Sequence, residues 1–130
     1  MKKYIGTKII EAEPQVKDGV DGYKVKYNDG YVSWSPKDVF DDAYREIEYM
    51  SFGLALEALR KGYKVARKGW NGKGIYIEMQ RPDEHSKMTQ PYLYIVTSNL
   101  ITDNPYAPKG LVPWLPSQTD MLGEDWLIVE

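Results

Sequence analysis

Hydrophobic and polar residues alternate along a short stretch near the start of the chain. Residues 23–27 read Tyr-Lys-Val-Lys-Tyr, and residues 28–30, Asn-Asp-Gly, separate them from residues 31–34, Tyr-Val-Ser-Trp. Alternation with a period of two is typical of a half-buried strand, and Asn-Asp-Gly favours a tight turn. The pattern therefore predicts a β-hairpin, and the β-prone residues 8–12 predict a strand before it.

A helical pattern follows this hairpin. Ser35 suits the N-cap position, and Pro36 stands at the first helical position, where proline is tolerated. The apolar residues that would line one face of the helix are Val39, Phe40, Ala43, Tyr44 and Ile47. We therefore expect residues 1–49 to form a small module of a β-hairpin and a helix.

A second helix is predicted at the start of residues 50–130. Ser51 suits its N-cap, and Gly62 stands where a left-handed residue ends a helix. The apolar stripe of this helix is Phe52, Ala55, Leu56 and Leu59. Strands are predicted over 63–67 and 75–79, and Asn71-Gly72 favours a hairpin between them.

The remaining pattern adds strands and one short helical turn. Residues 81–90 read as a polar loop, and strands are predicted over 92–97 and 126–129. Ser117 can cap a helical turn over 118–122. The expected fold is α+β, a mostly antiparallel sheet with two short helices and an N-terminal β-hairpin-helix module, with domains at 1–49 and 50–130.

The composition narrows the class of protein. Of 130 residues, 42% are hydrophobic and 28% charged, and the formal charge of -2 gives no general attraction for DNA or RNA. Cysteine is absent, which excludes disulfides and zinc-thiolate sites, and no apolar run approaches the roughly 20 residues that span a bilayer. We expect a cytoplasmic protein without a membrane partner.

Catalytic chemistry has little support in the sequence. His85 is the one histidine, and it lies in the polar stretch 82–87, which we interpret as a solvated surface loop. Walker A motifs, dinucleotide fingerprints and metalloprotease helices are absent. We expect no enzymatic activity, no metal and no cofactor.

The segment 67–74, Arg-Lys-Gly-Trp-Asn-Gly-Lys-Gly, is suited to bind a nucleotide. Arg67 and Lys73 can pair with phosphate oxygens, and Trp70 can stack on a base. Asn71 can donate and accept hydrogen bonds, and the glycines let the backbone approach a ligand closely. The structural alternative is a hairpin turn with a half-buried tryptophan.

The C-terminal segment 112–126 adds further candidates. Its aromatic residues and carboxylates are Trp114, Trp126, Asp120, Glu124 and Asp125. Carboxylates can accept hydrogen bonds from ribose hydroxyls or an adenine amino group, but they repel a pyrophosphate unless Arg67 or Lys73 lies between. The structural alternative is helix capping and solvation, which we favour for Glu124 and leave open for Asp120 and Asp125.

Three motifs stand in order along residues 50–130. They read SFGLALEAL from Ser51, VARKGWNG from Val65, and PWLPSQTD from Pro113 followed by EDW from Glu124. Together they resemble the Thoeris anti-defense 2 family of phage proteins. The resemblance implies a ligand-binding domain that sequesters cyclic ADP-ribose isomers, such as glyco-cyclic ADP-ribose, made by Thoeris TIR proteins, without cleaving them.

The same resemblance implies an assembly and a set of residue roles. It implies a homotetramer with pockets at subunit interfaces and, in some members, a second site for CBASS cyclic dinucleotides. Trp70 would stack on adenine and Arg67 would offset phosphate charge. The residues that would read ribose or base edges are Asn71, Gln118, Asp120 and Asp125, and those that would wall the pocket or pack are Phe52, Trp114 and Trp126. Residues 1–49 depart from the family pattern.

Two other functions stay open at this stage. The first is an interaction module that docks on a host or phage protein through its tyrosines and tryptophans, which are frequent at hot spots. The second is a hydrolase that degrades the messenger with Asp120, Glu124 or Asp125. A sequestering protein has to outcompete the effector, so we expect nanomolar binding, on the order of -12 kcal/mol.

Overall fold

The computed structural model describes all 130 residues, which divide into two compact units, Met1–Arg45 and Glu46–Glu130. We call them the N-terminal unit and the C-terminal unit. They contain three helices and eight strands in two antiparallel sheets, so the predicted α+β class is confirmed. None of the helices combines the length and apolar character that crossing a bilayer requires.

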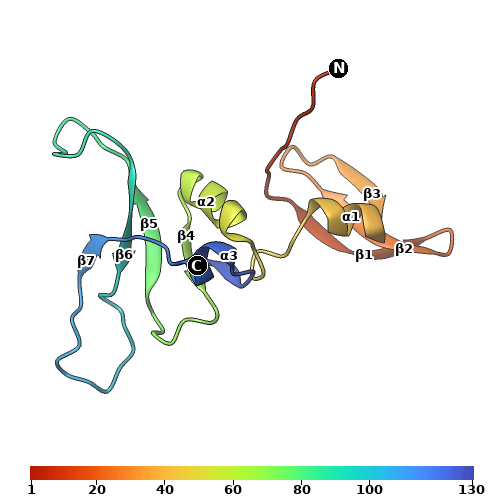
Figure 1. Ribbon diagram of the computed structural model, residues 1–130. Coiled ribbons are helices and arrows are strands. Elements are labelled where there is room, and N and C mark those ends of the chain that lie inside the picture. Colours follow the sequence, from red (N-terminus) through yellow and green to blue (C-terminus); the bar gives the residue numbers. More distant parts are fainter. The chain divides into compact units, whose positions relative to one another are not determined.

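The N-terminal unit is a three-stranded sheet with one helix against it (Figure 1). Its strands are β1 (Glu11–Lys17), β2 (Val20–Lys26) and β3 (Val32–Pro36), in that order across the sheet, and its helix is α1 (Lys37–Ala43). Phe40 of α1 stacks on Tyr23 of β2 at 4.1 Å, and the neighbouring Val25 is buried. The predicted hairpin is confirmed, and its turn places Gly30 at a φ of 88°.

Helix α1 differs from its prediction at both ends. Ser35 belongs to β3 and does not cap the helix; Pro36 occupies the N-cap without a side-chain bond. The strand continues to Pro36 because that residue pairs with Gly22, and the residue before a proline favours extended backbone. The helix ends at Ala43, so Tyr44 follows it and Ile47 lies outside it.

The C-terminal unit is built on a five-stranded antiparallel sheet in the order β7-β6-β5-β4-β8. Its elements are α2 (Phe52–Arg60), β4 (Lys64–Arg67), β5 (Tyr76–Gln80), β6 (Tyr92–Val96), β7 (Leu111–Pro113), α3 (Gln118–Leu122) and β8 (Trp126–Val129). The predicted pairing of β4 with β5 is confirmed, with Val65 opposite Ile77. Strand β7 was not predicted, because three residues ending in a proline carry no alternation to detect.

The end signals of α2 and α3 were predicted correctly. Ser51 Oγ accepts a hydrogen bond from the Leu54 amide at 3.3 Å, and Gly62 has a φ of 95° after the last turn of α2. Ser117 caps α3, and Asp120 completes a capping box with it. Both helices therefore begin at a side-chain oxygen that accepts from a free backbone amide.

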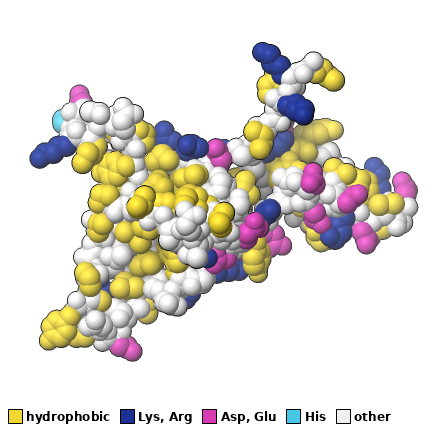
Figure 2. Space-filling model, in the orientation of Figure 1, with side chains coloured by type: hydrophobic (Ala, Val, Ile, Leu, Met, Phe, Trp, Pro, Cys, Tyr) yellow, Lys and Arg dark blue, Asp and Glu magenta, His cyan; other side chains and the backbone are white.

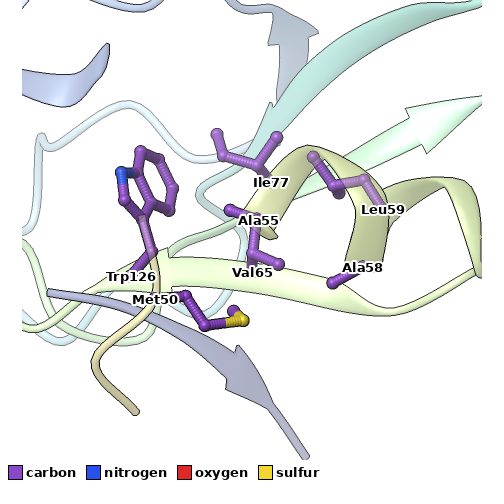
Figure 3. Packing of buried hydrophobic residues seen from close by; sticks show 7 residues of the cluster. All are labelled: Met50, Ala55, Ala58, Leu59, Val65, Ile77 and Trp126. Atoms are coloured by element: carbon purple, nitrogen blue, oxygen red, sulfur yellow. The ribbon is translucent and has the colours of Figure 1, made fainter. Parts of the chain in front are cut away.

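The core lies between α2 and one face of this sheet. Figure 3 shows its buried residues, which are Met50, Ala55, Ala58, Leu59, Val65, Ile77 and Trp126. Met50 pairs with Trp126 through two backbone hydrogen bonds, and the Ile128 amide donates to the Ile47 carbonyl. Residues 46–50 are therefore attached to β8.

The opposite face of the sheet carries the alternate residues of each strand, and no helix covers it. They include Ala66, Tyr76, Tyr92, Tyr94 and Leu127. Hydrophobic side chains gather over the C-terminal unit on the side seen in Figure 2. His85, at 86% side-chain exposure, lies in a loop, which confirms its assignment to the surface.

Candidate functional site

Three tryptophans and one phenylalanine from distant parts of the sequence meet at one end of the core. Trp126 lies at the centre and is fully buried, with ring centroids 5.2 Å from Phe52, 5.4 Å from Trp70 and 6.0 Å from Trp114. Most of the pairs meet edge to face, which the quadrupoles of aromatic rings favour. We call these four residues the aromatic cluster.

A charged group lies beside the aromatic cluster. Arg67 is the last residue of β4 and stands opposite Trp126 on the neighbouring strand β8. Its side chain therefore lies next to Asp125, the residue before Trp126. Its Nε donates to Asp125 Oδ1 at 2.8 Å, and its Nη1 donates to Asp120 Oδ1 at 3.0 Å. The three side chains are 17%, 28% and 14% exposed in the order Arg67, Asp125, Asp120. The guanidinium therefore separates two carboxylates that would otherwise repel each other.

Asp120 joins the charged group to the aromatic cluster. Its Oδ1 also accepts from the indole Nε1 of Trp70 at 3.1 Å, and its backbone carbonyl accepts from Nε1 of Trp126 at 2.8 Å. Its Oδ2 accepts from the Ser117 amide at 3.0 Å. One residue of α3 thus fixes the orientation of two indole rings.

These contacts change the acidity of both carboxyl groups. Burial by itself would raise the pKa of Asp120, but hydrogen bonds from Ser117, Trp70 and Arg67 outweigh it and lower the pKa to about 2. Burial also acts to raise the pKa of Asp125, while Arg67 and the Gly69 amide lower it further than burial raises it. Both side chains are therefore carboxylates at neutral pH.

The lowered pKa of Asp120 predicts how stability depends on acid. The folded-state pKa of Asp120 is near 2, below the ordinary 3.8, so its ionised carboxylate stabilises the fold. This stabilisation is complete above about pH 4 and is lost as the pH falls towards 2. We expect the free energy of unfolding of the C-terminal unit to fall by about 2 kcal/mol across this interval because of Asp120. Urea denaturation at several pH values measures this loss.

A matched pair of variants tests the assignment. Asp120→Asn removes the titrating group, so its stability should vary less with pH in this interval than that of the wild type. Asp103→Asn makes the same charge change at an exposed loop position and should leave the pH dependence unchanged. Equal pH dependence in the wild type and Asp120→Asn would contradict the role given to Asp120.

Glycines of the 67–74 segment make room for the protein's own chain. The Gly69 amide donates to Asp125 Oδ2 at 2.8 Å, and a Cβ at this position would lie 2.7 Å from that oxygen. Gly74 has a φ of 84°, and a Cβ there would collide with the backbone oxygen of Asn99. The structure accounts for these two glycines by packing within the chain.

An open depression of about 330 Å³ lies beside this group, on the uncovered side of the sheet. Its lining combines cationic, aromatic and aliphatic residues: Ala66, Arg67, Lys68, Trp70, Gly72, Lys73, Gly74, Ile75, Tyr76, Leu127 and Val129. Lys73 Nζ donates to the Lys68 carbonyl at 2.8 Å, and Lys68 Nζ lies 3.2 Å from Glu48 Oε2. Both lysines thus belong to the lining of a partly apolar hollow, and both ammonium groups have a partner within the chain.

The structure brings most of the predicted site residues together. The seven that meet in the aromatic cluster and the charged group are Phe52, Arg67, Trp70, Trp114, Asp120, Asp125 and Trp126. Asn71 and Gln118 lie apart, exposed in the 68–75 connection and at the start of α3. Tyr76 and Leu127 were missed; the signal that could have found them is their alternation with the buried Ile77 and Trp126 along their strands.

Comparisons with known proteins agree with this reading of the C-terminal unit. The Thoeris anti-defense 2-like domain matches residues 50–129. A protein named Thoeris anti-defense 2, from Bacillus phage SP01, is 38% identical over 89 residues, which cover 62% of this chain and 94% of that protein. These matches place the chain in the class of phage anti-defense proteins. The chain belongs to the Thoeris anti-defense 2-like family.

Proposed function

We propose that this protein binds and sequesters cyclic ADP-ribose isomers, such as glyco-cyclic ADP-ribose, which Thoeris TIR proteins make. The observation that carries the proposal is the depression in which Trp70 and Arg67 lie beside Lys68 and Lys73. The indole of Trp70 matches the base of such a ligand and the ammonium of Lys73 matches its pyrophosphate, while Arg67 and Lys68 are also paired with carboxylates of the chain. Membership of the Thoeris anti-defense 2-like family supports the same assignment.

In the proposed function the messenger is bound without being cleaved. A carboxyl group that acts as a general acid or base at neutral pH needs a pKa raised towards 7. The pKa values of Asp120 and Asp125 are lowered, and both carboxylates are held by Arg67. This arrangement suits a fixed binding surface better than hydrolysis.

The proposed assembly is a homotetramer with ligand pockets between subunits. It is supported by the uncovered sheet face and by four exposed aliphatic side chains in and beside β7 and α3. They are Leu111 at 62%, Val112 at 52%, Leu115 at 87% and Leu122 at 78% exposure. Exposed apolar surface of this kind marks interaction sites. Sedimentation equilibrium of the purified chain tests the proposed tetramer. A monomeric mass would contradict it.

Titration calorimetry with cyclic ADP-ribose isomers tests the site. Trp70→Ala should weaken binding by roughly tenfold to a hundredfold, because it removes the surface on which a base can stack. Lys73→Ala should weaken it less, and Lys109→Ala, another exposed loop lysine away from the depression, should leave it unchanged. Cyclic dinucleotides titrated in parallel show whether the protein also binds that class.

Two further measurements are needed to interpret the titrations. Circular dichroism has to show that Trp70→Ala keeps its fold, since Trp70 also contacts Trp126 and Asp120. Chromatography of the ligand recovered after heating has to return it intact; a cleaved product would replace sequestration by hydrolysis. Unchanged affinity in both Trp70→Ala and Lys73→Ala would rule out the depression as the binding site.

A further inference from the structure

The N-terminal unit, which lies outside the matched residues 50–129, carries a tryptophan on the face of its sheet away from the helix. Helix α1 covers the side of Tyr23, where Phe40 stacks. Trp34 pairs across β2 and β3 with Lys24, so its side chain belongs to the opposite face. No helix or strand of this unit covers that face.

The indole of Trp34 is fixed flat across the sheet. Its Nε1 donates to the backbone carbonyl of Gln15 in β1 at 2.9 Å, so the ring reaches over the middle strand. The middle strand has Gly22 at this point, and a Cβ there would collide with the indole ring. Gly22 leaves room for the ring, and the hydrogen bond to Gln15 holds it in place. The indole is therefore a fixed part of this surface.

A groove of about 440 Å³ lies along this surface. Its lining has an apolar part, in which Val32, 45% exposed, lies on the same face as Trp34. Val16 also borders the groove, but its pairing with Asp21 places its side chain on the Tyr23 face. The charged residues of the lining are Lys17 and Lys24, and no carboxylate belongs to it. Glu13 lies nearby, 4.0 Å from Lys24 Nζ, in an exposed ion pair of a kind that contributes about 1 kcal/mol or less and so holds Lys24 only weakly.

The chemistry of the groove favours one class of partner. Lys17 Nζ already lies over the Trp34 ring, 5.7 Å from its centroid, and the ring also lies against Gly22 of the middle strand, so a nucleobase could stack on it only by displacing the lysine. The exposed Val32 beside the indole suits aliphatic side chains, and two ammonium groups suit carboxylates. We infer that this groove binds an extended protein segment in which acidic residues flank one or two aliphatic ones.

This interaction is independent of the proposed messenger binding and can be tested on the full chain. The probes are two synthetic peptides of about a dozen residues, one with glutamates and aspartates around two central leucines, the other with lysines in place of the acids. Heteronuclear NMR should show the acidic peptide shifting the amide signals of residues 15–17, 24 and 32–34 and the indole signal of Trp34. The basic peptide should shift none of them.

Two double variants with the same charge change complete the test. The double variant Lys17→Glu with Lys24→Glu should weaken binding of the acidic peptide by roughly tenfold or more, because the attraction between the groove and the peptide becomes repulsion. Lys2→Glu with Lys3→Glu, outside the groove, should have no such effect. Shifts by both peptides, equal losses in both variants, no shifts at all, or a stronger response of the same signals to adenosine monophosphate would each overturn the inference.

Discussion

Replacing Trp126 by alanine is expected to lower the free energy of unfolding of the C-terminal unit by about 3–5 kcal/mol. Trp126 is fully buried and contacts Phe52, Trp70 and Trp114. Its removal opens a cavity that these rings cannot fill, and it leaves the Asp120 carbonyl without its indole donor. Urea denaturation followed by circular dichroism measures the loss without depending on the deleted fluorophore.

Trp126→Phe serves as the graded control for this prediction. It keeps an aromatic ring in the cluster but removes the N–H, so its loss should be smaller than that of the alanine variant. If the Trp126→Ala protein were as stable as the wild type, Trp126 would not be the residue on which the core depends.

Arg67→Ala is expected to lower the free energy of unfolding by about 2–4 kcal/mol at neutral pH. The substitution leaves the carboxylates of Asp120 and Asp125, 14% and 28% exposed, without the cation that separates them. The cost should shrink in acid, because protonation of the carboxyl groups removes their repulsion. Thermal or urea denaturation at neutral and acidic pH measures both effects.

Arg60→Ala is the matched control. Arg60 pairs with Glu57 at 3.1 Å on the surface of α2, with 58% of its side chain exposed, and such pairs contribute about 1 kcal/mol or less. A loss for Arg67→Ala no larger than that for Arg60→Ala would show that the charged group does not stabilise the fold.

The elements that could be predicted from the sequence are those whose signals are local. The hairpin turn at Asn28-Asp29-Gly30, the Ser51 and Ser117 caps and the end of α2 at Gly62 depend on residues close together in the chain. The strand predicted over 8–12 lies further along the chain, as β1 (Glu11–Lys17), and β7 was not predicted. All of β1 is exposed and it contains Pro14, and β7 is too short for a period to be read.

The site was predicted as a set of residues, and the structure adds how they are connected. Residues such as Arg67 and Trp70 stood out by type, but their bonds to Asp120 join positions 53 and 50 residues apart. No local pattern encodes those distances; they follow from the pairing of β4 with β8, which places Asp125 beside Arg67. The same pairing explains why Tyr76 and Leu127, ordinary strand residues, line the depression.

The place of β8 in the sheet also has a consequence for biosynthesis. This strand supplies Trp126 to the core and pairs with β4 along its whole length, yet the ribosome makes it after every other strand. Until it emerges, the edge of β4 is unpaired, and unpaired edges are where nascent chains associate wrongly. The sheet of the C-terminal unit can therefore be completed only after β8 has been synthesised, and until then this edge of β4 has no partner strand.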